Sequence, residues 1–155
     1  MNIVIAPQEL KPGNIHFHEP VTNTVMDDSS FIRVGYSNAD VTLNGIYLDI
    51  SLNVNRIDKY FHKYKYVFDY SNNMDCIDLL INIETMILNN VMIPNIRCIH
   101  KLKEQFMHNS IRVFENIDSP PRSLTPGVYN FTLKISGIWA TDTDCGLTFK
   151  FFSQN

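Results

Sequence analysis

Residues 129–151 read YNFTLKISGIWATDTDCGLTFKF, and they carry the clearest β-hairpin pattern in the chain. Phe131, Leu133 and Ile135 alternate with polar residues, as expected of a strand with one buried face. An acidic loop at residues 140–144 leads into a second alternating run at residues 147–151. This segment predicts an antiparallel hairpin that closes a β-rich fold.

One segment has the pattern of a helix. Residues 74–92 place apolar side chains at near-helical spacing, interrupted only by Glu84, with acidic residues in the first turn and Pro94 beyond the end. A short buried strand at residues 79–83 is the alternative. Further strands are expected at residues 3–5, 15–18, 30–37, 46–54, 60–70, 96–103 and 111–114.

The predicted fold is mainly β with one central helix, an OB-fold-like small barrel. Five strands with one helix between the third and the fourth fit this order, and in that fold the barrel face and two loops carry the ligand. Residues 1–155 contain no linker, repeat or low-complexity tract, so we expect a single β-rich domain.

Aromatic and basic side chains are interleaved at residues 60–70, which read YFHKYKYVFDY. As one strand, this segment puts Tyr60, Tyr64 and Tyr66 on one face, and Lys63 and Lys65 on the other. Rings that stack on bases, next to cations that neutralise phosphates, are typical of proteins that bind single-stranded nucleic acid. An aromatic ladder that only stabilises the sheet is the alternative.

The candidate nucleic-acid site extends beyond this segment. Stacking is assigned to Tyr60, Tyr64, Tyr66 and Trp139, and phosphate contact to Arg56, Lys59, Lys63, Lys65, Lys101 and Lys103. The two faces of one strand cannot both line a groove, so either the tyrosines or Lys63 and Lys65 lie in it, unless a twist or bulge intervenes. Trp139 could equally plug the barrel mouth, and the lysines at 101 and 103 could guard a strand edge.

Composition narrows the class of protein. The 155 residues are 45% hydrophobic and carry a net charge of −3, so the chain has the profile of a folded protein and lacks the basic balance of a duplex-DNA binder. Three cysteines, far apart in the sequence and without a C-x-x-C pair, predict neither a disulfide framework nor a zinc site. No run approaches the roughly 20 apolar residues of a membrane helix, so we expect a soluble, intracellular protein.

Catalytic and metal-binding patterns are weak. His16 and His18 would share a strand face, and the pairs 27–28 and 142–144 could offer carboxylates, but no set of ligands is complete. Cys145 has no histidine nearby in the sequence, and no nucleotide-binding or hydrolase motif occurs. We therefore expect no enzyme activity, no metal and no cofactor.

Three segments resemble single-stranded DNA-binding proteins of the OB-fold type from large DNA viruses and phages. They are residues 31–50 (FIRVGYSNADVTLNGIYLDI), 99–114 (IHKLKEQFMHNSIRVF) and 133–152 (LKISGIWATDTDCGLTFKFF), and the likeness extends over roughly half of the chain. Residues 146–151 are most similar to the last strands of such barrels. Unlike many members of that group, the chain ends on an apolar strand rather than an acidic tail.

The resemblance implies non-enzymatic binding of single-stranded nucleic acid, DNA rather than RNA, in viral DNA replication or recombination. We expect a location in the host nucleus or cytoplasm, without membrane association. The sequence allows a homo-oligomer but does not give the oligomeric state. The alternative is a structural or assembly β-domain, such as a virion component, that uses the aromatic segment as a protein–protein patch. The acidic pI of about 5.9 favours the alternative, whereas the interleaved lysines favour nucleic-acid binding.

Overall fold

The predicted C-terminal hairpin is present in the computed structural model, which describes residues 3–114 and 124–154. The strands are β1 (Ile15–Phe17), β2 (Val21–Thr22), β3 (Ser30–Ser37), β4 (Thr42–Asn44), β5 (Ile46–Tyr60), β6 (Lys63–Phe68), β7 (Arg97–Ile99), β8 (Ser110–Phe114), β9 (Gly127–Ala140) and β10 (Asp144–Ser153). The helices are α1 (Met74–Asn90) and α2 (Lys101–Met107), and the 3₁₀ turns are η1 (Pro7–Glu9), η2 (Pro12–Asn14) and η3 (Tyr70–Asn72).

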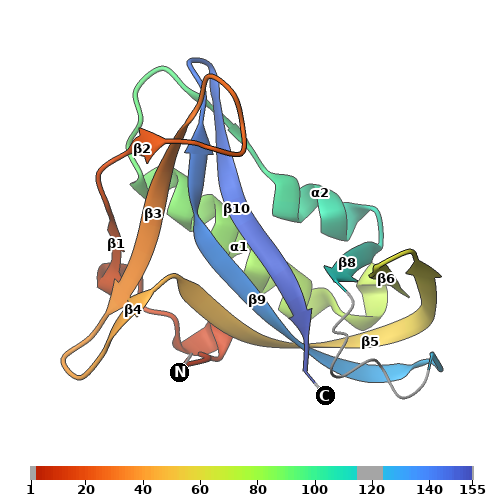
Figure 1. The fold of residues 1–155 in the computed structure, drawn as a ribbon. Coiled ribbons are helices and arrows are strands. Elements are labelled where there is room, and N and C mark those ends of the chain that lie inside the picture. Colours follow the sequence, from red (N-terminus) through yellow and green to blue (C-terminus); the bar gives the residue numbers. More distant parts are fainter. Residues whose placement is uncertain (1–2, 115–123, 155) are drawn as a thin grey trace.

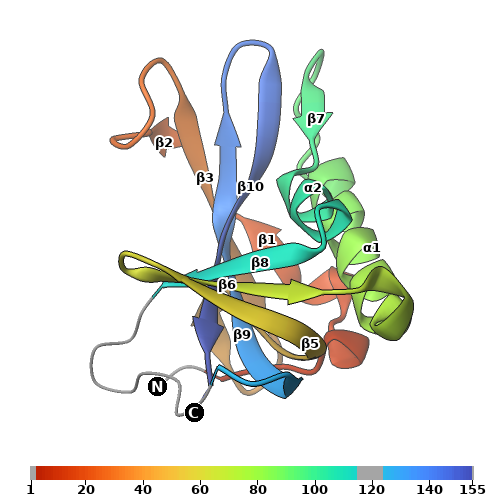
Figure 2. The ribbon, with the colours of Figure 1, turned by 90° about the vertical axis from the view of Figure 1, so that its right-hand side faces the viewer.

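Five strands close into a barrel in the spatial order β5–β6–β8–β10–β9 and back to β5 (Figures 1 and 2). All neighbours are antiparallel except β8 and β10, which run parallel. The first half of β5 pairs with β9 and the second half with β6, across a register shift between Val54 and Arg56 that helps the strand curl. The prediction of a mainly β, OB-like barrel is confirmed.

The remaining strands form an arm on one side of the barrel. β3 pairs with the end of β9 nearest the β9–β10 turn, and β1, β2 and β4 pair with β3. In Figure 1 this orange arm stands beside the blue hairpin of β9 and β10. The predicted strand at residues 30–37 is therefore confirmed as β3.

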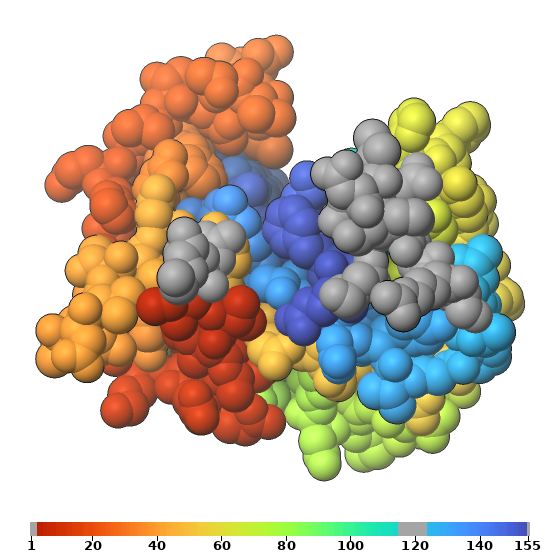
Figure 3. All heavy atoms as spheres, turned by 60° about the horizontal axis from the view of Figure 1, so that its bottom comes forward, coloured from red at the N-terminus to blue at the C-terminus, as the bar shows by residue number. Residues whose placement is uncertain are grey.

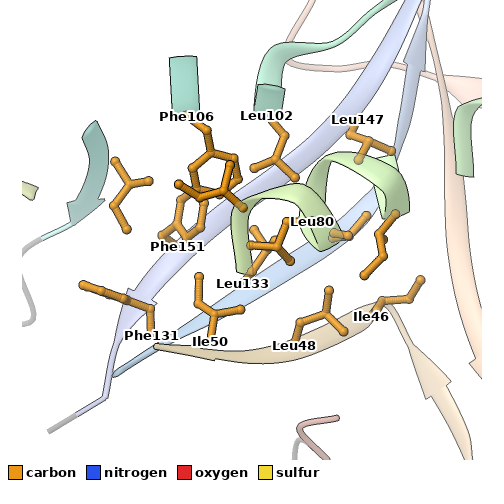
Figure 4. Close-up of a cluster of buried hydrophobic side chains, with 14 of the residues drawn as sticks. Ile46, Leu48, Ile50, Leu80, Leu102, Phe106, Phe131, Leu133, Leu147 and Phe151 are labelled. Carbon is orange, nitrogen blue, oxygen red and sulfur yellow. The ribbon is translucent and has the colours of Figure 1, made fainter. Parts of the chain in front are cut away.

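The core lies between the barrel and α1. Helical spacing brings Ile77, Leu80 and Ile87 to one buried face of α1, so the helix prediction is confirmed. Figure 4 shows Leu80 among apolar side chains of β5, β9 and β10, and Leu102 and Phe106 of α2 closing the same cluster.

The segment at residues 60–70 is not one strand, and this prediction was wrong. β5 ends at Tyr60, Phe61 and His62 form a two-residue turn with a positive φ of 48° at Phe61, and β6 starts at Lys63. The turn places Tyr60 opposite Lys63 in the register. Since directly paired residues share a face of the sheet, Tyr60 lies with the lysines and not with the later tyrosines.

Two further predictions need correction. Residues 96–103 were expected to be one strand, but β7 covers only Arg97–Ile99 and α2 begins at Lys101. The main helix was expected between the third and fourth strands of the barrel. It lies between the second and third, because β6 precedes α1 and β8 follows it. The strand at residues 30–37, which precedes β5, belongs to the arm and not to the barrel.

Candidate nucleic-acid interface

Outward side chains of β6 and β8 form one basic and aromatic surface. Tyr60, Lys63 and Phe114 lie side by side in the register, and Lys65 lies opposite Arg112. We call these five residues the β6–β8 surface. In β6 and β8 these side chains alternate with buried ones such as Tyr64 and Val113, so they point away from the core. Tyr60 shares their face because it is paired with Lys63.

Two rings on this surface are open to solvent. Tyr60 is 53% exposed and Phe114 is 47% exposed. The Lys63 ammonium lies 4.9 Å from the centre of the Phe114 ring, and the Lys150 ammonium of β10 lies 4.1 Å from it. These cation–π contacts hold positive charge next to an exposed ring, which is the arrangement that a stacked base with its phosphate requires.

Two open hollows meet on the surface. The first is about 330 Å³ and is lined by Tyr60, Lys63, Tyr64, Lys65 and Arg112. The second is about 710 Å³ and is lined by Lys65, Lys101, Glu104, Gln105, His108, Ser110 and Arg112. Lys65 and Arg112 belong to both, so the two hollows form one continuous path from the β5–β6 turn to α2.

The cations on this path are available to a ligand. Within residues 3–114 and 124–154, neither Lys63 nor Lys65 nor Arg112 forms an ion pair with a carboxylate. Lys101 lies 3.4 Å from Glu104 in an exposed pair, which contributes little stability and leaves the lysine free to exchange partners.

Glu84 positions α2 beside the surface. This buried carboxylate of α1 accepts hydrogen bonds from the backbone N–H groups of Leu102 (2.8 Å) and Lys103 (3.0 Å), which are the first unpaired donors of α2. Burial raises the pKa of Glu84, and the two N–H bonds lower it only in part. The Nδ1 atom of His100 lies 3.7 Å from the Glu84 Oε1 atom and is buried without a hydrogen-bond partner among the described residues.

Tyr64 and Tyr66 cannot provide stacking rings at the surface, so the structure corrects their assignment. Tyr66 is fully buried and packs edge-on against Phe131 at 4.8 Å between ring centres. Burial also raises the pKa of its phenol. Tyr64 is buried as well, with the Lys59 ammonium 5.9 Å from its ring centre. The two-residue turn is the cause, because it directs the even-numbered side chains of β6 into the core.

The other predicted residues are dispersed. Arg56 is exposed and paired with Asp58 at 3.1 Å. Lys59 lies opposite Tyr64 and therefore on the other face from Lys63. Lys103 is exposed on α2 but does not line either hollow.

Trp139 lies on β9, beside the arm. It is opposite Gly146 in the register and its ring covers that glycine, where an added Cβ would lie 2.8 Å from the Trp139 Cζ2 atom. Its other cross-strand neighbour is Phe31 of β3. The structure thus brings Tyr60, Lys63, Lys65 and Lys101 together and leaves Trp139 with the β3 arm.

Sequence reasoning missed Arg112 and Phe114. Both belong to the predicted strand at 111–114, where they alternate with the buried Ile111 and Val113. That alternation was a usable signal that their side chains point outward.

Candidate metal ligands do not gather into a site. The rings of His16 and His18 lie 5.4 Å apart between centres. Among the described residues, no group of three or more His, Cys, Asp or Glu side chains could hold a metal ion. Cys98 and Cys145, far apart in the sequence, are opposite each other on β7 and β10 with 3.8 Å between sulfur atoms.

Comparison with protein-family models, with curated proteins and with solved structures finds no match in any of the three. In the part of the chain that the structure describes, no helix is both long and apolar enough to cross a bilayer.

Proposed function

We propose that this protein binds single-stranded nucleic acid, without catalysis, along the β6–β8 surface. The observation that carries the proposal is the position of that surface in the barrel. In OB folds the second and third strands face the oligonucleotide, and here β6 and β8 are the second and third barrel strands. They carry three outward cations and the exposed ring of Phe114, and the exposed ring of Tyr60 lies next to them at the end of β5.

The local charge supports this proposal despite a net charge of −3. Lys63 and Lys65 lie on β6, and Arg112 lies on the adjacent strand β8, at the usual spacing of about 4.8 Å between strands. Lys101 extends the row onto α2. A local basic path with stacking rings is sufficient for a single strand, whereas duplex binders are usually basic over the whole domain.

Each type of side chain has a separate role. Bases stack on Phe114 and Tyr60, whose side chains are about half exposed. Every base has a face that can stack on a ring, so little sequence preference is expected. The cations follow the phosphates, and Arg112 can hold two phosphate oxygens at once. The resemblance in the sequence favours DNA as the strand, and viral DNA replication or recombination as the setting.

The test is a titration of labelled oligo-dT, followed by fluorescence anisotropy at about 50 and 200 mM salt. Three phosphate contacts predict a slope of about −2 for log K against log salt, at about 0.7 per contact. Phe114→Ala should weaken binding about 5- to 150-fold, equivalent to roughly 1–3 kcal/mol of stacking. Arg112→Gln should reduce the slope by about 0.7.

Arg97→Gln is the matched control, because Arg97 lies on β7 and pairs with Asp144 at 2.9 Å. It removes the same charge as Arg112→Gln and should leave both affinity and slope unchanged. Absence of binding to oligo-dT at low salt would refute the proposal. That result would favour an assembly module whose exposed rings contact another protein.

A further inference from the structure

A second row of cations and rings lies on the outer faces of β9 and β10. Lys134 of β9 is directly opposite Lys150 of β10, and both side chains point away from the core. Phe152 of β10 is 40% exposed, and the Lys150 ammonium lies 5.5 Å from its ring centre. The Lys134 ammonium lies 5.6 Å from the centre of the Tyr47 ring on β5. We call Tyr47, Lys134, Lys150 and Phe152 the β9–β10 surface.

The Lys134–Lys150 pair is unfavourable for folding by itself. Like charges directly opposite on neighbouring strands destabilise a sheet. Within residues 3–114 and 124–154, neither lysine forms an ion pair with a carboxylate that would offset the repulsion. An anionic ligand that bridges the two ammonium groups would remove this cost.

Phe114 connects this surface to the β6–β8 surface. The ammonium groups of Lys63 and Lys150 lie 4.9 and 4.1 Å from its ring centre. The parallel pairing of β8 with β10 brings these residues together, since Val113 is opposite Phe151. Cations and rings therefore continue without a break from β6 across β8, β10 and β9 to Tyr47.

The far end of the row lies in a hollow beside the arm. One cavity of about 350 Å³ is lined by Arg33, Thr42, Leu43, Asn44, Tyr47, Lys134 and Ser136. A neighbouring one of about 300 Å³ is lined by Val4, Tyr47, Thr132, Lys134 and Phe152. In Figure 3 the blue atoms of β9 and β10 lie recessed beside the orange β3–β4 arm. Arg33 adds a third cation at this end.

We infer that the single strand does not end at β8 but continues over Phe114 onto the β9–β10 surface, with Lys134 and Lys150 each holding a phosphate and Phe152 stacking a base. This inference rests on the proposed function. It predicts a longer binding site than the β6–β8 surface alone, extending toward Arg33.

The test compares dT oligomers of about 4 and about 16 nucleotides, which bracket the site sizes of OB folds. The wild-type protein should lose affinity for the long oligomer between about 50 and 200 mM salt. In the double variant Lys134→Gln/Lys150→Gln this loss should be about sevenfold smaller, because two phosphate contacts are missing and each contributes about 0.7 to the salt slope. Lys134→Gln alone should leave binding of the short oligomer within about twofold of the wild-type value. Lys134 lies outside the β6–β8 surface, whereas the Lys150 ammonium contacts the Phe114 ring of that surface.

Two comparisons make the result decisive. Lys65→Gln/Arg112→Gln removes the same charge from the β6–β8 surface and should weaken both oligomers. Arg97→Gln should weaken neither. The double variant Lys134→Gln/Lys150→Gln loses a like-charge pair, so its melting temperature should not fall below that of the wild-type protein. A change in binding by this variant will therefore not reflect unfolding.

The outcomes separate the two proposals. If the wild-type protein binds both oligomers and Lys134→Gln/Lys150→Gln keeps the full salt dependence, the path over β9 and β10 is wrong and the proposed function stands. Equal losses for short and long oligomers in Lys134→Gln would also overturn the path, because Lys134 would then belong to the same short site as the β6–β8 cations. If the wild-type protein binds neither oligomer, the proposed function itself fails.

Discussion

Replacing Glu84 separates two opposing effects of a buried carboxylate. Its oxygens accept the N–H groups of Leu102 and Lys103 and so fix the start of α2, but the charge is held in a fully buried position. Burial raises its pKa, which means that the folded protein prefers the neutral form more than the unfolded chain does. We therefore expect Glu84→Ala and Glu84→Gln to behave in opposite ways.

Glu84→Ala should lower the free energy of unfolding by about 2–4 kcal/mol. The Leu102 N–H is buried and would lose the acceptor that it has in the described structure, at roughly 1–3 kcal/mol, and the smaller side chain adds a cavity. In Glu84→Gln the amide oxygen still accepts one N–H group. The amide nitrogen can turn toward the unpartnered Nδ1 of His100. At neutral pH this variant should be as stable as the wild-type protein or slightly more stable.

The pH dependence follows from the sign of the shift. A carboxyl group whose pKa is raised by folding contributes stability below its ordinary value near 4.5, and that stability is lost as the pH rises through the raised pKa. The wild-type protein should therefore match Glu84→Gln at acidic pH and fall below it toward neutrality. His100 and Glu104 both interact with this carboxyl group and modulate the shift.

Urea denaturation of the wild-type protein and both variants, from about pH 4 to pH 8, measures these differences. Glu19→Gln is the matched control, because this exposed glutamate lies between β1 and β2, forms no ion pair in the described structure and should cost less than about 1 kcal/mol. The reasoning is refuted if Glu84→Gln costs as much as Glu84→Ala at neutral pH. In that case the N–H bonds would stabilise the charged carboxylate more than burial destabilises it. The wild-type protein would then gain stability relative to Glu84→Gln as the pH rises.

Three further predictions concern the core, the exposed ring of Tyr60 and the β9–β10 hairpin. Tyr66→Ala should cost about 3–5 kcal/mol in urea denaturation, whereas Tyr60→Ala should cost less than about 1 kcal/mol and weaken oligo-dT binding instead; equal costs would contradict the assigned faces. Burial raises the pKa of Cys145 to about 12, so about one thiol in ten thousand is ionised at pH 8. Iodoacetamide should therefore not label Cys145 until the protein unfolds. Labelling of Cys145 in the folded protein, detected by peptide mass mapping, would contradict this prediction. Gly146→Ala should displace the Trp139 ring, and the emission of this sole tryptophan should shift to longer wavelength; an unchanged spectrum would show that the ring does not cover the glycine.

Sequence patterns predicted the elements whose pattern is local. The β9–β10 hairpin, β3, β8 and α1 all follow from periodicity within one segment. The start of α2 does not, because it depends on a carboxylate 18 positions away, Glu84, that accepts the Leu102 N–H. Residues 96–103 alone have enough apolar alternation to suggest a strand.

The faces of β6 were mispredicted for a different physical reason. Strict alternation continues through residues 60–70 as if no turn were present. A two-residue turn between paired residues, however, exchanges the faces of the sheet on which the even- and odd-numbered side chains after it lie. The reversal buries Tyr64 and Tyr66 and places Tyr60 with Lys63 and Lys65. It also removes the conflict between an aromatic face and a basic face, since one outward surface now carries both kinds of side chain.

The surface that remains is assembled from short pieces with a common pattern. In Arg112-Val113-Phe114 and in Lys150-Phe151-Phe152, a cation and a ring flank a residue that faces the core. Alternation alone turns both flanking side chains outward in each strand. Because β8 and β10 run parallel with Val113 opposite Phe151, the two outward pairs come together with the same polarity. The tyrosine-rich segment attracts attention in the sequence, but the proposed path of the strand follows the cation–core–aromatic triplets, because they place a cation and a ring outward on neighbouring strands.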